Sequence, residues 1–487
     1  MLGKHRKENI KDKKKQLTRL RIVFLIITII FIAITIRFYI SIIKTNMLPT
    51  MYITIFTIVV AVITLLLALG LSKKHKTLKL NIISLILILI ISAGYLFANH
   101  YVDATMNFLG KILTEVAEVE QYYVIVKKDS SYNKIEDVNN KEIYGFQVEE
   151  DVKQKIQNKI TVTLNEGDNL TALGTSLMNN EIEVIVISLS QYNMLGEEVE
   201  GFKDNTKIIY TETHQIQVQS SIEDANSEYT IENGIFNVYI SGIDVFGGIN
   251  NVSRSDANII ATVNTKTHEV LLTSIPRDYY VTLHNKKAKD KLTHSGIYGI
   301  NETVTTVEDL LGIDINYYVR VNFTTVIKLV DTLGGIDVYS DYAFTGLEGY
   351  SFRKGNNHLN GNSALAFSRE RYSFKDGDNQ RIKNQQKVIE AIMNKALSST
   401  TILTKYSSIL DSLSGSFNTN IDQNDISSIV KEQLEKMPSW KIKTISLTGT
   451  ASEGPTYSLG SQLVSIMLPD EKSIEDARSA INAVMGK

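Results

Sequence analysis

The stretch RSDANIIATVNTKTHEVLLTSIPRD, residues 254–278, decides the fold of the larger part of this chain. It contains two apolar runs of strand length, Ala257–Val263 and Glu269–Ile275, joined by a short polar segment that predicts a tight turn. A third run, IFNVYIS at 235–241, precedes them across a longer loop. Three sequential strands with this spacing predict an antiparallel meander.

Charged residues stand where these three strands begin and end. They are Asp244 after the first strand, Arg254 and Asp256 before the second, and Arg277 and Asp278 after the third. Strands that run up, down and up bring all of these positions to one edge of the sheet. We therefore expect charges far apart in sequence to meet at one rim.

The helices and strands that follow the meander indicate the fold class. Helices predicted at 301–311, 324–333 and 379–397 alternate with apolar strands at 317–322 and 336–339. Such alternation predicts an α/β fold with a mixed central sheet and helices on its faces. We expect this domain to span residues 234–487.

A second, smaller α/β domain is predicted at 122–219, where short β-rich runs alternate with helical patterns. The segments VIVKKDSSYNKIEDVNNKEIYGF (124–146) and ALGTSLMNNEIEVIVIS (172–188) resemble one lobe of a type 2 solute-binding protein. The alternative is a spacer domain with no ligand of its own. Residues 99–121 are predicted to form a helix that links this accessory domain to what precedes it.

Three apolar runs near the N-terminus, at 22–43, 50–71 and 78–98, are each long enough to cross a bilayer. Residues 1–21 form a basic tail, and basic residues also cluster at 73–79. The positive-inside rule therefore predicts a cytoplasmic N-terminus, three membrane spans over 22–98, and an extracytoplasmic body. We predict a multi-pass cell-membrane protein.

The net charge of −2 hides this division. Residues 1–97 carry 15 basic and two acidic side chains, a net +13, so the remainder carries −15. A strongly basic domain is missing, which argues against nucleic acid as a partner. With no cysteine, no HExxH and no GxSxG, the sequence also offers no support for thiol chemistry, zinc proteolysis or an α/β-hydrolase triad.

Arginines and carboxylates dominate the predicted rim. Arg369 and Arg371 are two residues apart and would share a side in an extended chain, and Arg381 and Gln385 share a helix face. With Arg254 and Arg277 they make five guanidinium groups, which suit a phosphate-rich anion. Paired carboxylates beside bound phosphates make a reasonable Mg²⁺ site.

Seven segments together resemble the signature of the LytR–CpsA–Psr family. In chain order they are GIDVFG (242–247), RSDANIIATVN (254–264), VLLTSIPRDYYV (270–281), KLTHS (291–295), LVDTLGGIDV (329–338), HLNGNSALAFSRER (358–371) and GDNQRIKNQQKVIEAI (377–392). The three-span anchor and the accessory domain are similar to those of some streptococcal-type members. Thr293 and the pair Phe367-Ser368 depart from the usual pattern, and we expect neither departure to touch a charged site residue.

The resemblance implies a Mg²⁺-dependent phosphotransferase. Such an enzyme moves a glycopolymer, capsular or teichoic-acid-like, from undecaprenyl pyrophosphate onto peptidoglycan. It implies Asp244 and Asp256 at the metal, and Asp256, Arg277 and Arg371 in catalysis. The implied pyrophosphate-binding residues are Arg254, Arg277, Arg369, Arg371, Arg381 and Gln385. Candidates for the wall of a lipid tunnel are Val326, Leu329, Val330, Val388, Ile389 and Ile392.

The sequence leaves alternatives for the catalytic base and for the function. Asp256 and Asp278 are both possible acceptors of the proton from the muramic acid hydroxyl. Hydrolysis of the lipid pyrophosphate by the same site is one alternative function. A non-catalytic membrane receptor or regulator of envelope polymer synthesis, sensing through residues 122–219, is another.

Overall fold

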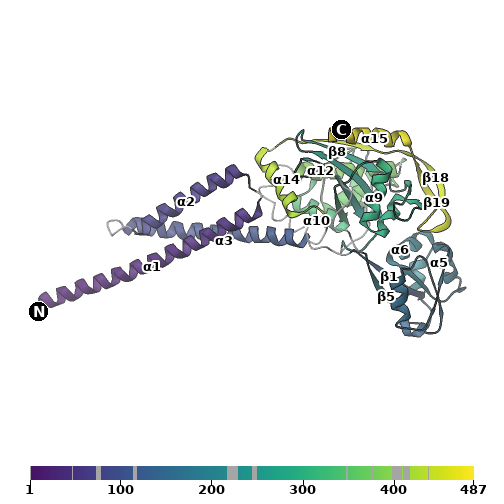
Figure 1. The fold of residues 1–487 in the computed structure, drawn as a ribbon, viewed down its shortest axis with the longest axis horizontal. Helices are drawn as coiled ribbons and strands as arrows, with labels where there is room; N and C mark the ends of the chain where they lie inside the picture. The colour runs from purple at the N-terminus through teal and green to yellow at the C-terminus, as the bar shows by residue number, and fades with distance from the viewer. Residues whose placement is uncertain are drawn as a thin grey trace. The chain divides into compact units, whose positions relative to one another are not determined.

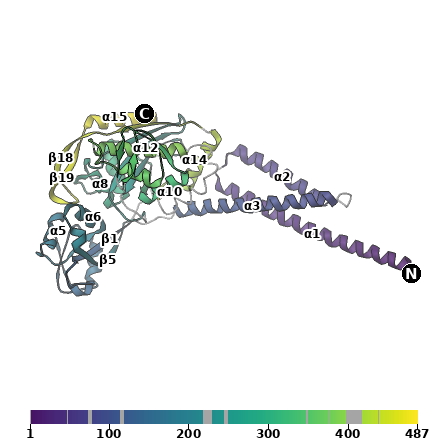
Figure 2. The ribbon, with the colours of Figure 1, turned by 180° about the vertical axis from the view of Figure 1, so that it is seen from behind.

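The structure is a computed structural model of the whole chain, and Figures 1 and 2 show it from two sides. It describes residues 2–46, 48–72, 78–112, 118–216, 229–243, 249–346, 349–375, 377–396, 409, 417–436 and 438–487. The chain divides into two units. One comprises Met1–Gly110 with Asp422–Met437, and the other Lys111–Ile421 with Pro438–Lys487.

The first unit consists of long apolar helices and one amphipathic helix. Its helices are α1 (Leu2–Thr45), α2 (Thr50–Ser72), α3 (Leu78–Ile112) and α14 (Gln423–Lys436). Three segments are long and apolar enough to cross a membrane: Ile22–Thr45, Thr50–Gly70 and Asn81–His100. Phe31, Leu67 and Ile88 pack together between them. These helices support a membrane anchor, as the three apolar runs predict.

The accessory domain, the first part of the second unit, is a five-stranded sheet in the order β3-β2-β4-β1-β5. Its strands are β1 (Glu118–Lys127), β2 (Glu142–Gly145), β3 (Thr163–Glu166), β4 (Ile185–Ser188) and β5 (Thr206–Ile216). Its helices are η1 (Ile135–Val138), α4 (Glu150–Gln157), α5 (Leu170–Met178), α6 (Leu189–Glu198) and α7 (Phe202–Asn205).

The prediction of a linker helix reaching residue 121 is wrong at its end. Helix α3 ends at Ile112, and β1 begins at Glu118 and pairs with β5 along its whole length. The local helical spacing of apolar residues here is outweighed by the backbone hydrogen bonds that β1 makes with two neighbouring strands.

The second domain is built on a six-stranded mixed sheet in the order β16-β11-β6-β7-β8-β17. Its strands are β6 (Ile235–Ile243), β7 (Ser255–Asn264), β8 (Glu269–Ile275), β11 (Tyr317–Asn322), β16 (Phe417–Thr419) and β17 (Lys441–Ser446). Strands β6, β7 and β8 pair antiparallel in sequence order, so the predicted meander is confirmed. Strand β11 joins β6 in parallel and β17 joins β8 in parallel, which makes the sheet mixed as expected.

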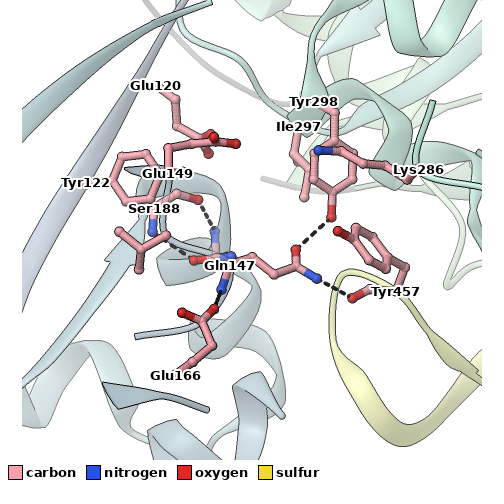
Figure 3. A pocket seen from close by; sticks show the side chains of 12 residues that line it. Glu120, Tyr122, Gln147, Glu149, Glu166, Ser188, Lys286, Ile297, Tyr298 and Tyr457 are labelled. Atoms are coloured by element: carbon pink, nitrogen blue, oxygen red, sulfur yellow. Dashed lines mark hydrogen bonds between the residues drawn. The ribbon is translucent and has the colours of Figure 1, made fainter. Parts of the chain in front are cut away.

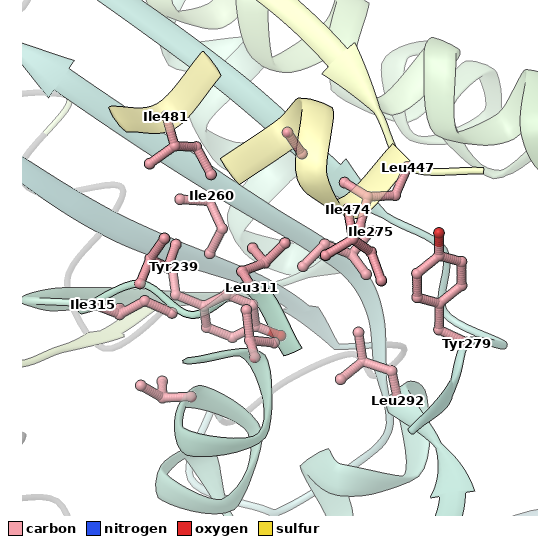
Figure 4. Packing of buried hydrophobic residues seen from close by; sticks show 14 of the residues in the cluster. Tyr239, Ile260, Ile275, Tyr279, Leu292, Leu311, Ile315, Leu447, Ile474 and Ile481 are labelled. Carbon is pink, nitrogen blue, oxygen red and sulfur yellow. The ribbon is translucent and has the colours of Figure 1, made fainter. Parts of the chain in front are cut away.

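Two layers of helices pack with this sheet. Helices α9 (Ile300–Leu311) and α15 (Glu471–Met485) enclose one core with residues of the meander, including Tyr239, Ile260 and Ile275 (Figure 4). A second core joins α10 (Phe323–Leu333), α11 (Gly361–Arg369) and α12 (Asp378–Ala396) with the two-stranded sheet of β12 (Ile336–Ser340) and β15 (Gly355–Leu359). Gly334 follows α10 with φ of +80°, a backbone conformation that ends helices and that glycine adopts without strain.

Smaller elements complete the second domain, and some of them contact the accessory domain. They are β9 (Tyr280–Thr282), β10 (Lys289–Lys291), α8 (Leu292–Ser295), η2 (Gly296–Tyr298), β13 (Phe344–Thr345), β14 (Ser351–Phe352), β18 (Gly449–Thr456) and β19 (Gly460–Pro469). The β18–β19 hairpin, absent from our sequence prediction, contacts the accessory domain: the Leu170 amide donates to the Leu459 carbonyl at 3.2 Å.

A cavity of about 320 Å³ lies between the accessory domain and the second domain (Figure 3). A buried ion pair also joins the two domains. Glu118 at the start of β1 accepts from Arg320 of β11, and each side chain is 2% exposed. The carboxylate of Glu118 also accepts from the Ile300 amide at 3.0 Å. The accessory domain is therefore tied to the sheet by polar groups that water does not reach.

Candidate active site

Asp256 is the centre of the candidate site. It lies at the start of β7, where the meander brings it beside the end of β8. Its Oδ2 accepts from an Arg277 guanidinium nitrogen at 3.1 Å, and its Oδ1 accepts from the Thr293 hydroxyl at 2.8 Å. The expectation that Thr293 stays clear of the charged residues is therefore wrong, because the short helix α8 turns this side chain toward the carboxylate.

The pKa of Asp256 reflects the positive charge that surrounds it. Burial alone would raise the pKa of this carboxyl, but Arg277, Arg254 and Arg381 outweigh burial, with help from the Thr293 hydroxyl. Together they lower the pKa to about 2, so Asp256 is ionised at neutral pH. Three arginines that are far apart in the sequence thus act on one carboxylate.

Arg277 continues this charged row along the rim. Its Nε lies 3.6 Å from Oδ2 of Asp278, and the Lys291 amine lies 3.6 Å from Oδ1 of the same carboxylate. The sequence analysis did not predict Lys291 as a site residue, although Lys291 is the first residue of the family-like segment KLTHS. The part of the expected rim formed by Asp256, Arg277 and Asp278 is therefore present, with Lys291 added to it.

Arg254 is held by a residue of the accessory domain. Its two terminal nitrogens donate to the two carboxylate oxygens of Glu197, at 2.8 and 2.5 Å. The Arg254 side chain is 15% exposed, while Glu197, near the end of α6, is 58% exposed. Burial would raise the pKa of Glu197, but the hydrogen bonds and charge of Arg254 lower it. A carboxylate thus occupies the guanidinium fork that the sequence assigns to phosphate.

Nothing in the sequence near Glu197 indicates this role. It lies in a helical run of the accessory domain, about sixty residues before Arg254 in the chain. Only the packing of the two domains brings its carboxylate to the rim.

Arg381 and Gln385 lie on α12, four residues apart, so they occupy one face of this helix. Arg381 is 7% exposed and is close enough to Asp256 to lower its pKa. Gln385 is half-buried. The structure therefore brings Arg381 to the same charged cluster as Arg254 and Arg277.

The premise that placed Arg369 and Arg371 on one side of an extended chain is wrong. Arg369 is the last residue of helix α11, and Arg371 follows in a turn. The Arg369 guanidinium stacks on the Phe323 ring at 4.3 Å, whereas Arg371 lies 4.7 Å over the Tyr372 ring and donates to its hydroxyl at 2.6 Å. Both cations therefore rest on aromatic faces.

Of the two residues predicted to hold Mg²⁺, the structure describes Asp256. Asp244 lies outside the described residues. Asp256 fits the role of a metal ligand chemically, because it is ionised and each of its oxygens has a second lone pair beyond the bond to Arg277 or Thr293.

The lipid-tunnel candidates lie on α10 and α12. Val330 and Val388 are buried in the core that these helices share, and Val326, Leu329 and Ile392 are partly buried against it. Ile389 is half-buried on the same helix as Val388. Five of the six candidates therefore belong to one apolar cluster.

Comparisons with known proteins agree with the segments that carry the resemblance. Residues 195–478 match the LytR_cpsA_psr family. The polyisoprenyl-teichoic acid–peptidoglycan teichoic acid transferase TagU of Bacillus licheniformis is 36% identical over 256 residues, which cover 52% of this chain and 78% of that protein. TagU of Bacillus subtilis is 37% identical over 223 residues, covering 46% of this chain and 72% of that protein.

Solved structures also match about half of this chain. The crystal structure of B. subtilis TagV has 30% sequence identity and a TM-score of 0.44, covering 52% of this chain and 97% of that one. The crystal structure of B. subtilis TagU has 33% identity and a TM-score of 0.41, with the same coverage. The family match spans more than half of the residues, from the end of the accessory domain through the rim to α15. This chain therefore belongs to the LytR–CpsA–Psr family.

Proposed function

We propose that this chain is a membrane-anchored transferase that moves a teichoic-acid-type glycopolymer from undecaprenyl pyrophosphate to a hydroxyl of peptidoglycan. The observation that carries the proposal is the cluster of Arg277, Arg254 and Arg381 around the ionised Asp256. Guanidinium groups gathered in a body of net charge −15 suit a dense, localised anion such as a pyrophosphate. The transferase activity for which the two TagU relatives are named points the same way.

The proposed reaction exchanges one phosphorus–oxygen bond for another. The peptidoglycan hydroxyl oxygen attacks the phosphorus next to the glycopolymer sugar, and the bond from that phosphorus to the bridging oxygen breaks. The leaving group is undecaprenyl phosphate, and the hydroxyl proton passes to a base. The arginines stabilise negative charge on the transferred and leaving phosphates, which is the main task of a protein in phosphoryl transfer.

Two carboxylates of the rim are candidates for the base that accepts the proton of the peptidoglycan hydroxyl. Asp256 is a poor proton acceptor, because its neighbours lower its pKa to about 2. Asp278 is the other candidate from the sequence, and it lies between Arg277 and Lys291 on the rim. We propose Asp278 as the base.

Mg²⁺ is part of the proposal, with Asp256 and Asp244 as its protein ligands. When bound, the ion would neutralise charge on the pyrophosphate oxygens. Asp256 is held ready for this role by Arg277 and Thr293. The anchor, with the N-terminus in the cytoplasm, would hold the rim at the outer face of the membrane, next to the lipid carrier.

The function can be tested with the full chain in liposomes, a synthetic polyprenyl-pyrophosphate-linked polymer as donor, and peptidoglycan as acceptor. We expect Mg²⁺-dependent transfer that EDTA abolishes and added MgCl₂ restores. An Arg371→Ala, Arg381→Ala double variant should lose about 10³-fold in rate, since two phosphate-binding cations disappear together. Arg353→Ala is the matched control, because Arg353 is exposed and, among the described residues, its side chain bonds only to the nearby Asn356 carbonyl through its Nε.

Three results would contradict the proposal. Full transfer by the double variant would show that the arginines do not bind the donor. Equal donor turnover with and without peptidoglycan would favour hydrolysis of the lipid pyrophosphate. Absence of transfer, together with ligand-dependent signalling that survives Asp256→Asn, would favour a receptor.

The ion pair between Glu197 and Arg254 leads us to a separate prediction about the affinity for the lipid donor. Glu197→Gln removes the negative charge from the Arg254 fork, which frees this guanidinium for a donor phosphate. We expect the KM for the lipid donor to fall about threefold to tenfold with kcat little changed, roughly the strength of one charge-assisted contact. Glu198→Gln is the control, since the exposed Glu198 carboxylate accepts only from the Gln462 amide, at 3.3 Å, among the described residues. An unchanged or higher KM would mean that Glu197 instead holds Arg254 in its working position.

A further inference from the structure

The cavity between the accessory domain and the second domain is separate from the charged rim. The accessory domain supplies Glu120, Tyr122, Gln147, Val148, Glu149, Glu166, Ser188 and Gln191, and the second domain supplies Lys286, Ile297, Tyr298 and Tyr457. None of the rim residues described above lines it. Its volume of about 320 Å³ is at the small end of the range for ligand sites.

The two walls of this cavity carry opposite charge. The accessory wall presents the carboxylates of Glu120, Glu149 and Glu166, and the opposite wall presents the amine of Lys286, as Figure 3 shows. The Lys286 amine lies 4.7 Å over the ring of Tyr298, which holds it on its own side. A ligand between these walls would meet anionic groups at one end and a cation at the other.

Glu120 is the most unusual of these groups. It lies on β1, is only 9% exposed, and its carboxylate points into the cavity beside that of Glu149 (Figure 3). Among the residues that the structure describes, it forms no ion pair. A carboxylate buried to this degree normally has a cationic partner, because burial without one is costly.

Hydrogen bonds between the two domains fix the positions of the cavity walls. The Gln147 side chain spans the two domains: it donates to the Tyr457 carbonyl at 2.9 Å and accepts from the Tyr298 hydroxyl at 3.1 Å. Tyr298 also contacts the Ser458 hydroxyl at 2.9 Å. These bonds hold the cavity open at a defined width, so its shape is preorganised for a ligand.

A metal ion does not fit this site well. Within the described parts of the chain, no three His, Cys, Asp or Glu side chains are close enough to hold a metal. The tyrosine rings and Ile297 instead offer apolar surface for an organic body. A compact ammonium group suits the paired carboxylates, and a carboxylate suits Lys286.

We infer that this cavity binds a small zwitterionic ligand, a free amino acid or a dipeptide, with its ammonium group at Glu120 and Glu149 and its carboxylate at Lys286. The inference concerns the accessory domain and does not depend on the transferase proposal. It favours the hypothesis that residues 122–219 form a ligand-binding domain over the hypothesis that they form a spacer domain.

Isothermal titration calorimetry of the full chain in detergent tests this inference. The probes are the twenty L-amino acids, D-alanine, D-glutamate and D-alanyl-D-alanine, each titrated to 10 mM. At least one zwitterion should saturate the protein, and Glu120→Gln and Lys286→Met should each weaken it about tenfold or more, as expected for loss of a charge-assisted contact. Lys354→Met, at an exposed position, is the matched control and should leave affinity unchanged.

Analogues that lack one charge provide the second arm. The N-acetyl and amide forms of the bound zwitterion should each bind at least tenfold more weakly than the parent. Failure of all probes to saturate, or equal binding of the parent and both blocked forms, would overturn the inference. Because Lys286 lies on the other wall from Glu120, its variant keeps the test valid if Glu120→Gln does not fold.

The pH dependence of binding distinguishes a contact from a structural role. Burial raises the pKa of Glu120, and Glu149 raises it further, while Ser188, Ser190 and Lys286 oppose them, with a result of about 7. Tyr122 and Tyr298 also face this carboxyl and stay neutral, because burial raises the pKa of each above its usual value. Affinity should therefore rise several-fold from pH 6 to pH 8, and this slope should vanish in Glu120→Gln. A slope that survives the substitution would contradict the assigned contact.

Discussion

Replacing Arg277 with alanine is expected to lower kcat/KM for polymer transfer by about 10²–10³-fold, the usual effect of removing one group that stabilises transition-state charge. Arg277 is the residue that links the two carboxylates of the rim: it donates to Asp256 at 3.1 Å and lies 3.6 Å from Asp278. Its side chain is 16% exposed, so little water is available to replace its charge. The measurement is initial rate against donor concentration in liposomes.

Two further variants separate the geometry of Arg277 from its charge. Arg277→Lys keeps a cation but not the planar fork, so we expect it to recover about tenfold of the loss. Arg353→Ala, on the exposed surface, should behave as wild type. If Arg277→Ala keeps more than a third of the wild-type rate while its thermal unfolding is unchanged, the rim is not where the donor phosphates bind.

The second large effect concerns stability. Glu118→Ala should destabilise the junction of the two domains by about 3–5 kcal/mol, the typical result of removing one member of a buried ion pair. Within the described part of the chain, the Arg320 guanidinium, 2% exposed, would keep only its bond to the Asn251 carbonyl at 3.1 Å. The Ile300 amide would also lose its acceptor. Pulse proteolysis in urea measures the loss, with Glu198→Ala as an exposed-carboxylate control.

A double substitution tests whether the cost comes from the unpaired charge. Glu118→Met with Arg320→Met removes both ions, and replacing a buried pair by apolar side chains of similar volume is often close to neutral. We expect the double variant to recover most of the stability that Glu118→Ala loses. A double variant as unstable as the single one would mean that packing at this position, and not charge, holds the domains together.

Much of the fold follows from local pattern. The apolar runs at 235–241, 257–263 and 269–275, with the turns between them, predict a meander, and the structure has that meander. The membrane helices follow from length and apolar content, which need no tertiary contact. In contrast, the β18–β19 hairpin contains Gly449, Gly454 and Pro455 and gives no clear strand signal. Leu459, Val464 and Ile466, in and beside this hairpin, pack in one core with residues of the accessory domain.

The site divides in the same way. Sequence alone determined that Asp256, Arg254 and Arg277 stand at strand ends of a meander, and strand direction then requires them to share an edge. Only the tertiary structure decided that Glu197 occupies the Arg254 fork and that Thr293 binds Asp256, because those contacts join segments whose relative position no local periodicity encodes. It also placed Arg369 in a helix and Arg371 in a turn, since the core around Phe367 selects helix over extended chain. The cavity between the domains exists only where two separately folded surfaces meet, so its opposed charges cannot be read from either segment by itself.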